Sequence, residues 1–382
     1  MKKNSLTRLS KFALAMGLIL LMAATTEGGD SKDINNRLIA TTIAVDKRDG
    51  QIWFFLEFAN IQQGQSSGGG GAKKYILVKS KGETLPEVRA DLDRQLDRPL
   101  FLSEVRTLIL TEDFAKDHLV EYLYRLRADE SYRKKVLIVT TRDNLDALFK
   151  SLNERDVSLG YSIENTLATL EGLGGVYTRT TSRLLENLSD TYTGILIPCI
   201  GMQDQQSAVT GYSVVHDDRV TGFIPIESCK GLNLLKTDKA INFYVIPYKQ
   251  FQLTVEAVLT DRKVKATYEN GKPAFKFSLK FDATLEYGDK KIPYKITDAD
   301  SQAVSGILKQ IIEQDVRDAI YQAQYTFKTD YLQLDDAFRV AYPEVYDSMD
   351  WNVSFGEASI AAEVEVNLKP TYLVDYSVDV NR

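Results

Sequence analysis

The chain has 382 residues, of which 44% are hydrophobic and 26% charged, the balance of a folded protein rather than a disordered one. Its formal net charge is −6, but the first 26 residues hold four basic residues and no acid, which leaves 43 basic against 53 acidic residues in the remainder. An acidic body repels phosphate backbones, so nucleic-acid binding is not expected. The length predicts two or three domains.

The N-terminus has the layout of an export signal. A basic cluster within residues 1–11 precedes an uninterrupted apolar run at 12–24. That run is shorter than the ~20 residues that a membrane-spanning helix needs. We therefore expect residues 1–29 to be a signal or anchor segment that directs export, and the sequence leaves open whether it is cleaved.

From residue 38 onward, strand and helix patterns alternate. Runs of apolar and β-branched residues predict strands at 38–45, 51–61, 75–79, 105–111 and 135–140. Apolar residues at helical spacing predict one helix capped by Thr84 and another capped by Asp113. Shorter helical patterns follow at 144–152, 163–170 and 182–188. This alternation predicts a mixed α/β region in which helices cover a sheet.

Two glycine-rich stretches interrupt this region. Residues 62–74 read "QQGQSSGGGGAKK", which predicts a flexible hairpin tip or linker. No Lys-Ser or Lys-Thr pair follows at the spacing of a phosphate-binding loop. The second stretch, "GLGG" at 172–175, lacks the strand–turn–helix context of a dinucleotide site and is interpreted as a turn.

The second half of the chain is richer in strands. Strand-like segments separated by turns run from 194 to about 266, with "HDDR" at 216–219 joining two of them as a hairpin. A half-exposed strand is predicted at 273–287, and the longest helical pattern covers about 300–325. Acids at Asp298 and Asp300 would favour the N-terminal end of that helix. A helix at 332–342 ending at Pro343, and strands at 357–368 and 371–380, complete the chain.

The pattern of predicted strands and helices changes near residues 200 and 250, and these changes mark candidate domain boundaries. The prediction is an α+β or mixed α/β fold of three consecutive domains, each a sheet packed with helices. An N-terminal α/β domain is expected at 30–200, a small β-rich middle domain at 201–250, and a C-terminal α+β domain with the long helix at 251–382.

Residues able to carry chemistry are scarce. There is no nucleophile-elbow motif and no zinc-protease motif. Ser213 and His216 are close in sequence but point to opposite faces of a predicted strand. Cys199 and Cys229 allow one disulfide in an oxidising compartment, and two buried free thiols are the interpretation we favour. We predict no catalytic residue, no metal ligand and no cofactor-binding residue.

An ordered set of motifs carries a family resemblance. Residues 30–47 read "DSKDINNRLIATTIAVDK" and resemble the mature N-terminus of the Ger(x)C family, the C-subunit lipoproteins of spore germinant receptors. Residues 98–141 resemble the strand–helix–strand segment of that family, and 210–224 its middle hairpin. Residues 319–355 are similar to its C-terminal helical segment. The matching positions are Asp30, Asp33, Ile34, Asn35, Asp46, Lys47, Val220, Thr221, Gly222, Gln324, Asp330, Pro343 and Trp351.

The resemblance implies a non-enzymatic receptor subunit of three mixed α/β domains. It would couple nutrient sensing to germination on the outer face of the spore inner membrane, beside multi-spanning membrane subunits. The family defines no ligand-binding residue that can be carried over. One position departs from the family pattern: Gly29 stands where the lipidated cysteine is expected, and no cysteine precedes Cys199. Three explanations stay open: the uncleaved segment is the anchor, attachment comes only through partner subunits, or the sequence was altered at this position.

Two other functions fit weaker observations. The export signal and the many acidic residues are compatible with a secreted hydrolase of the cell wall, because paired carboxylates need no local motif. The strand–helix alternation of the first half is also compatible with a solute-binding module.

Overall fold

The computed structural model describes residues 36–60, 74–133, 135–153, 156–178, 180–188, 194–204, 206–288 and 297–369. The helices and strands described below lie in the compact unit Leu38–Arg382. The predicted signal segment 1–29, with Gly29, lies outside the described residues, as do the motif positions 30–35, nearly all of the loop 62–74 and the predicted strand 371–380. Among the described residues, no helix combines the length and the apolar character needed to cross a membrane.

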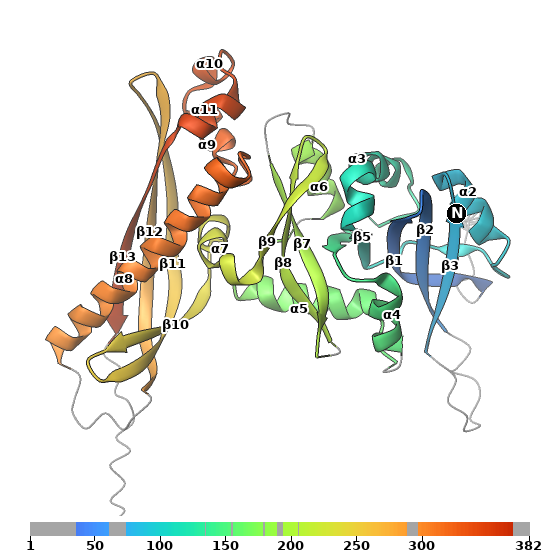
Figure 1. Cartoon of the computed structure of the whole chain (residues 1–382), viewed down its shortest axis with the longest axis horizontal. Helices are drawn as coiled ribbons and strands as arrows, with labels where there is room; N and C mark the ends of the chain where they lie inside the picture. The colour runs from blue at the N-terminus through green and yellow to red at the C-terminus, as the bar shows by residue number, and fades with distance from the viewer. Residues whose placement is uncertain are drawn as a thin grey trace, which may run out of the picture. The chain divides into compact units, whose positions relative to one another are not determined.

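The first half of this unit forms a nine-stranded sheet (Figure 1). Its order is β3-β2-β1-β5-β6-β7-β8-β9, with the short β4 also paired to β1. The central strands β1, β5, β6 and β7 are parallel, and antiparallel hairpins extend the sheet at both ends. The strands are β1 (Leu38–Arg48), β2 (Gln51–Ala59), β3 (Tyr75–Gly82), β4 (Leu100–Phe101), β5 (Thr107–Thr111), β6 (Leu137–Thr141), β7 (Ile195–Gln203), β8 (Gln206–His216) and β9 (Arg219–Pro225).

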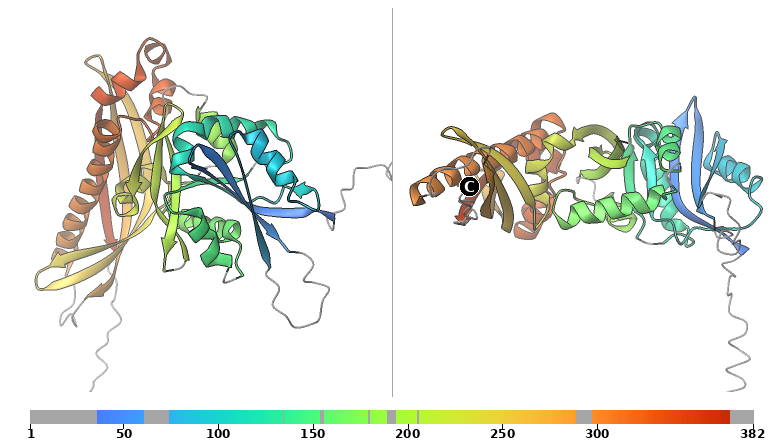
Figure 2. Two further views of the ribbon diagram at one scale, coloured as in Figure 1. Left: turned by 45° about the vertical axis from the view of Figure 1, so that its right-hand side comes forward. Right: turned by 90° about the horizontal axis from the view of Figure 1, so that it is seen from below.

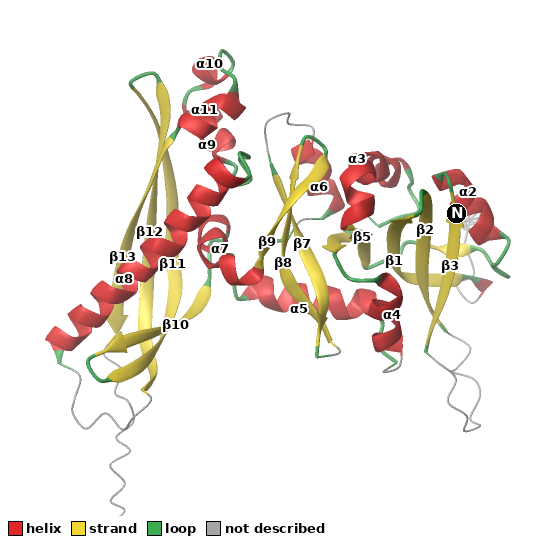
Figure 3. Ribbon diagram, in the orientation of Figure 1, coloured by secondary structure: helices red, strands yellow, loops and turns green. Residues whose placement is uncertain are grey.

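Helices cover both faces of this sheet, which explains why its central strands are apolar at nearly every position. Alternate residues of one strand enter different cores. Ile43 of β1 packs with the layer of α2, α3 and α6, whereas its neighbour Ala44 packs with the layer of α4 and α5. The helices are α2 (Leu85–Asp93), α3 (Glu112–Ala128), α4 (Leu145–Asn153), α5 (Leu159–Gly172) and α6 (Thr181–Leu188), drawn red in Figure 3.

The start of α2 confirms one predicted cap, and the start of α3 corrects another. The Thr84 hydroxyl accepts the N–H of Glu87, as the sequence predicts. Helix α3 is capped by Thr111 rather than Asp113. Thr111, the last residue of β5, is extended, and its hydroxyl accepts a hydrogen bond from the N–H of Phe114. Asp113 lies instead in the first helical turn, where its charge still favours the helix dipole.

The second half forms a separate four-stranded sheet of order β10-β11-β12-β13. Its first three strands are antiparallel and β13 runs parallel to β12. Helix α8 packs across one face, as both views of Figure 2 show, and buries Val304, Leu308, Ile312 and Val316. The strands are β10 (Ile241–Tyr248), β11 (Phe251–Glu269), β12 (Lys272–Gly288) and β13 (Ser359–Lys369).

The other face of this sheet is mainly polar along β12 and β13, whereas Phe243 and Val245 of β10 are exposed. Lys276 and Lys280 of β12 form ion pairs of 2.7 and 2.9 Å with Glu363 and Glu365 of β13. Alternation of inward apolar and outward polar residues therefore produces a sheet that is covered on one side.

The predicted long helix is confirmed as α8 (Asp298–Tyr321), which continues as a π-helical turn, η4 (Gln322–Thr326). Thr297 and Asp300 form a reciprocal capping box at its start, so the prediction that acids stabilise this end is confirmed. Helix α9 (Leu334–Ala341) is also confirmed. Pro343 begins a further short helix, α10 (Pro343–Tyr346), and α11 (Trp351–Glu357) follows, which the sequence analysis does not anticipate.

The range 201–250, predicted as a middle domain, contributes to both sheets. Strands β8 and β9 complete the nine-stranded sheet, the turn η3 (Ile226–Ser228) and helix α7 (Lys230–Lys236) follow, and β10 begins the four-stranded sheet. Its status as a domain of its own stays a prediction. The mixed α/β character, with each sheet packed by helices, is confirmed.

Candidate functional site

The structure does not group the residues that the sequence offered as possible catalytic or disulfide-forming residues. Ser213 is buried and its hydroxyl lies 2.7 Å from that of Thr140, while His216 lies at the strand end, 3.6 Å from Asp217. Cys199 and Cys229 are both buried free thiols, which confirms the interpretation favoured from sequence. Among the residues that the structure describes, no three His, Cys, Asp or Glu side chains are grouped to hold a metal ion.

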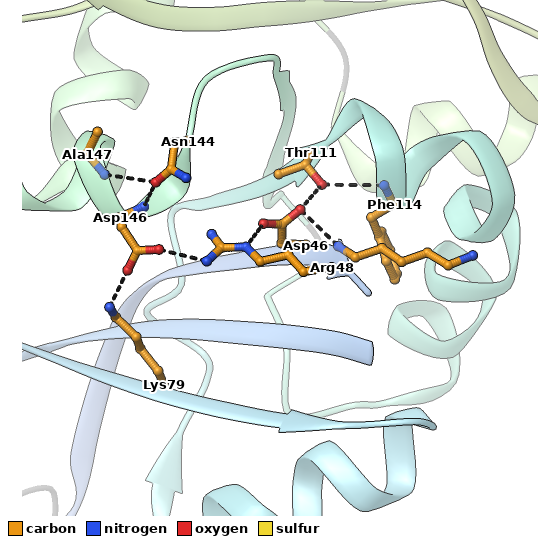
Figure 4. Close-up of polar contacts among 9 residues, drawn as sticks. Asp46, Arg48, Lys79, Thr111, Phe114, Asn144, Asp146 and Ala147 are labelled. Carbon is orange, nitrogen blue, oxygen red and sulfur yellow. Dashed lines mark hydrogen bonds and ion pairs between the residues drawn. The ribbon is translucent and has the colours of Figure 1, made fainter. Parts of the chain in front are cut away.

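The motif residues Asp46 and Lys47 instead begin a network of charges at the carboxyl ends of β1 and β5. Figure 4 shows Asp46 between Thr111 and Arg48. The Asp46 carboxylate accepts hydrogen bonds from the Thr111 hydroxyl at 2.7 Å and from the Lys47 N–H at 2.9 Å. The Lys47 ammonium reaches Asp117 of α3 at 2.7 Å. These contacts fix the end of β1 to α3, the helix that follows the neighbouring strand β5.

Arg48 extends this network to α4 and β3. Its guanidinium donates to Asp46 and, at 2.7 Å, to Asp146 in the first turn of α4, and Asp146 also pairs with Lys79 of β3 (Figure 4). The Arg48 guanidinium lies 5.1 Å from the ring centre of Phe55, a cation–π distance. We call Asp46, Arg48, Lys79 and Asp146 the edge network.

Electrostatic interactions in the edge network favour the charged forms of Asp146 and Arg48. Burial opposes ionisation of Asp146, but hydrogen bonds from Lys79 and Arg48 outweigh burial and lower its pKa. Burial likewise opposes the charge of Arg48, and its hydrogen bonds to Asp146 and Asp46 raise its pKa nonetheless. Arg48 and Asp146 are therefore held in their ordinary ionised states, which suits a structural clamp.

A second polar centre surrounds Glu57 of β2, which is 1% exposed. A β-bulge at Thr41 places two consecutive residues of β1 opposite Glu57, so both the Thr41 and Thr42 hydroxyls donate to it at 2.7 Å. The Ser158 hydroxyl at 2.6 Å and the Leu159 N–H at 3.0 Å complete its partners. Glu57 thus fixes the start of α5 to the sheet. A lone acid inside an apolar strand is the sequence signal that could have identified it.

A third polar centre gathers three motif residues of the C-terminal segment. Asp330 is 1% exposed and accepts hydrogen bonds from the Trp351 indole at 3.0 Å and from the backbone N–H groups of Leu334 and Asp335 at 3.2 and 2.9 Å. The amide of Gln324, in the π-helical turn, donates to the carbonyls of Phe355 and Ala358, both at 2.9 Å. These contacts fix the short helices α9 and α11 to the end of α8.

Two glycines allow this segment to approach the nine-stranded sheet. A Cβ at Gly222, a motif residue of β9, would lie 2.4 Å from the ring of Phe327. A Cβ at Gly194 would lie 2.0 Å from the Thr329 methyl group, and the Gly194 N–H donates to the Asp330 carbonyl at 3.2 Å. The motif glycine of the middle hairpin therefore leaves room for an aromatic ring of the C-terminal segment.

Comparisons with known proteins agree with this organisation. A family model described as "Spore germination protein N-terminal domain" matches residues 30–202, and one described as "Spore germination B3/ GerAC like, C-terminal" matches residues 210–372. The chain is 21% identical to spore germination protein B3 of Bacillus subtilis (strain 168) over 380 residues, covering 94% of this chain and 97% of that protein. It is 22% identical over 322 residues to the putative spore germination protein YfkR of the same organism, covering 80% of this chain and 82% of that protein.

The fold is also similar to a solved structure. The crystal structure of the GerBC protein superposes with a TM-score of 0.53 and 16% sequence identity, and the match covers 85% of this chain and 96% of that one. At this level of identity the likeness establishes the arrangement of the backbone, and it says nothing about individual side chains.

Proposed function

The chain belongs to the GerAC-like family of spore germination proteins, and from that premise we propose that it is a non-enzymatic subunit of a spore germinant receptor. In this role it would couple nutrient sensing to germination at the spore inner membrane. The observation that carries the proposal is that the two family models together span residues 30–202 and 210–372, almost the whole chain after the signal segment.

The contacts made by the motif residues support a binding or scaffolding role. Asp46 belongs to the edge network, Asp330 holds an indole and two backbone N–H groups, and Gly222 makes room for Phe327. Each of these positions stabilises a junction between elements. A subunit that transmits a signal by binding its neighbours needs such rigid junctions and needs no reactive group.

The proposed partners are the multi-spanning membrane subunits of the same receptor, and the proposed location is the outer face of the spore inner membrane. The basic and apolar character of residues 1–24 supports export. Since Gly29 replaces the cysteine that would be lipidated, membrane attachment would come from the N-terminal segment or from those partners.

Deletion of the gene tests the proposal, in spores that lack redundant receptors. We expect nutrient-triggered release of spore-core solutes to be lost and to return when the wild-type chain is supplied. Germination by a treatment that bypasses nutrient receptors provides the control and should be unchanged. An unaltered nutrient response in the deleted strain would refute the proposed role.

A further inference from the structure

The two sheets end in four edge strands, and β10 differs from the other three. Natural edge strands avoid pairing with other chains by means of charged side chains, proline or a covering segment. Strand β13 carries three charged residues and β3 carries two lysines. At β9, the ring of Phe327 lies against Gly222. Strand β10, labelled in Figure 3, reads "INFYVIPY" and has no charged residue.

Two large apolar side chains project from β10 into solvent. Tyr244 and Ile246 are buried in the core that α8 covers, so the alternate residues Phe243 and Val245 face away from α8. These two residues are 55% and 63% exposed. Uncharged segments of high β-propensity, such as residues 241–246, readily pair with strands of other chains. The edge at β10 therefore combines an apolar surface with the absence of charge.

The turn between β10 and β11 determines which backbone groups point out of this edge. Tyr248 and Phe251 are paired across a two-residue turn, so residues at even positions of β10 bond to β11 and those at odd positions point away from it. The hydrogen bond of Ile241 agrees with this alternation. Its N–H donates at 2.8 Å to the carbonyl of Leu173, which follows α5, and not to β11. An added strand therefore cannot extend to the row of Ile241.

The remaining stretch of the edge, residues 243–247, is complementary to itself. Among the described residues, none accepts a backbone hydrogen bond from the N–H of Phe243 or Val245, and Pro247 has no N–H. Val245 is the centre of this stretch. In an antiparallel pairing about a two-fold axis at Val245, its N–H bonds to the Val245 carbonyl of the other copy. The N–H of Phe243 then bonds to the Pro247 carbonyl of the other copy, so every N–H that the stretch leaves free is used.

We propose that this edge binds a second copy of the same chain, through antiparallel pairing of the two β10 strands about Val245. A two-fold contact uses the same patch on both copies, and residues 243–247 are both the free edge and an uncharged strand that fits it. The contact is closed, because each copy uses its own β10 edge. Strand pairing over this length buries less than the ~1,200 Å² of a stable complex, so we expect a dissociation constant of about 10–100 μM. The inference depends on the sheet edge and not on the proposed receptor role.

Sedimentation equilibrium of the full-length chain in density-matched detergent tests the proposal. We expect a monomer–dimer equilibrium in the wild-type chain. V245K should raise its dissociation constant about tenfold or more, because two positive charges would then face each other across the two-fold axis. V353K adds the same charge to α11 at a residue that is 60% exposed, and it should leave the constant within about twofold of wild type. Circular dichroism checks that both variants are folded.

A mixture of two charge variants tests the two-fold register. V245E alone should dimerise as poorly as V245K alone, and an equimolar mixture of the two should recover the dimer, because opposite charges then face each other. A wild-type chain that stays monomeric above the expected dissociation constant, or that forms species larger than a dimer, would overturn the proposal. Equal weakening by V245K and V353K, or a mixture that stays monomeric, would overturn it as well.

Discussion

The edge network and the centre around Asp330 each contain a family-motif carboxylate, Asp46 and Asp330, but they differ in their surroundings. In the edge network, Asp146 is 40% exposed and faces charged side chains, so water and salt compete with every contact. Asp330 is buried and accepts hydrogen bonds from two backbone N–H groups and an indole. If its carboxylate is removed, water cannot take its place as the acceptor for these buried donors. The two centres make similar numbers of polar contacts, but we expect the buried one to contribute much more to the free energy of unfolding than the exposed one.

The largest effect is expected at Asp330. Its replacement by alanine leaves three buried donors without their acceptor, and we expect the free energy of unfolding to fall by about 3–5 kcal/mol in denaturant titrations. D336A provides the control, because Asp336 is an exposed acid of α9, the helix whose first N–H groups donate to Asp330, and its loss should cost less than about 1 kcal/mol. Equal losses in the two variants would contradict the comparison.

Glu57 tests whether burial has the same effect in the nine-stranded sheet. E57L removes the acceptor of three hydroxyls and one N–H and should cost about 2–3 kcal/mol. E57Q should cost only about 1 kcal/mol, because its carbonyl can still face the Leu159 N–H while two of the three hydroxyls turn to accept from its amide. Thermal unfolding of both variants measures the difference. A glutamine variant as unstable as the leucine variant would show that the charge itself is required.

Gly222 tests the approach of the C-terminal segment to the nine-stranded sheet. G222A forces a methyl group toward the Phe327 ring and should destabilise by about 2 kcal/mol. F327L in the same chain should restore part of that loss, which a double-mutant cycle measures. G306A adds the same methyl group where α8 is open to solvent and should stabilise by up to about 1 kcal/mol. Additive effects of G222A and F327L would mean that the two residues are not in contact.

The smallest effect is expected at Asp146. D146N should lower the free energy of unfolding by less than about 1 kcal/mol, and the difference from wild type should shrink in 1 M salt. The folded-state pKa of Asp146 lies below its ordinary value of 3.8, so its charge contributes stability above that pH. That contribution is lost as the pH falls through the lowered pKa. A difference that persists after the pH has fallen below the folded-state pKa of Asp146 would show that hydrogen bonds rather than charge hold the edge network.

Much of the fold could be predicted from local patterns. The strands 38–45 and 51–61, the cap at Thr84 and the long helix each depend on neighbouring residues, and all are found. The partners of Asp330 and Glu57 could not be predicted, because they come from residues up to 21 and 102 positions away. The β-bulge at Thr41 and the short helix at Trp351 likewise depend on tertiary contacts.

Recovery of the chain from membranes of dormant spores is the strongest test of the proposed role as a receptor subunit. The chain would be captured by an antibody after mild detergent extraction, and the proteins that accompany it would be identified by mass spectrometry. We expect the multi-spanning subunits of one germinant receptor to accompany the wild-type chain and to be lost when the destabilised D330A chain is captured. A chain recovered in the soluble spore fraction, without any membrane subunit, would contradict it.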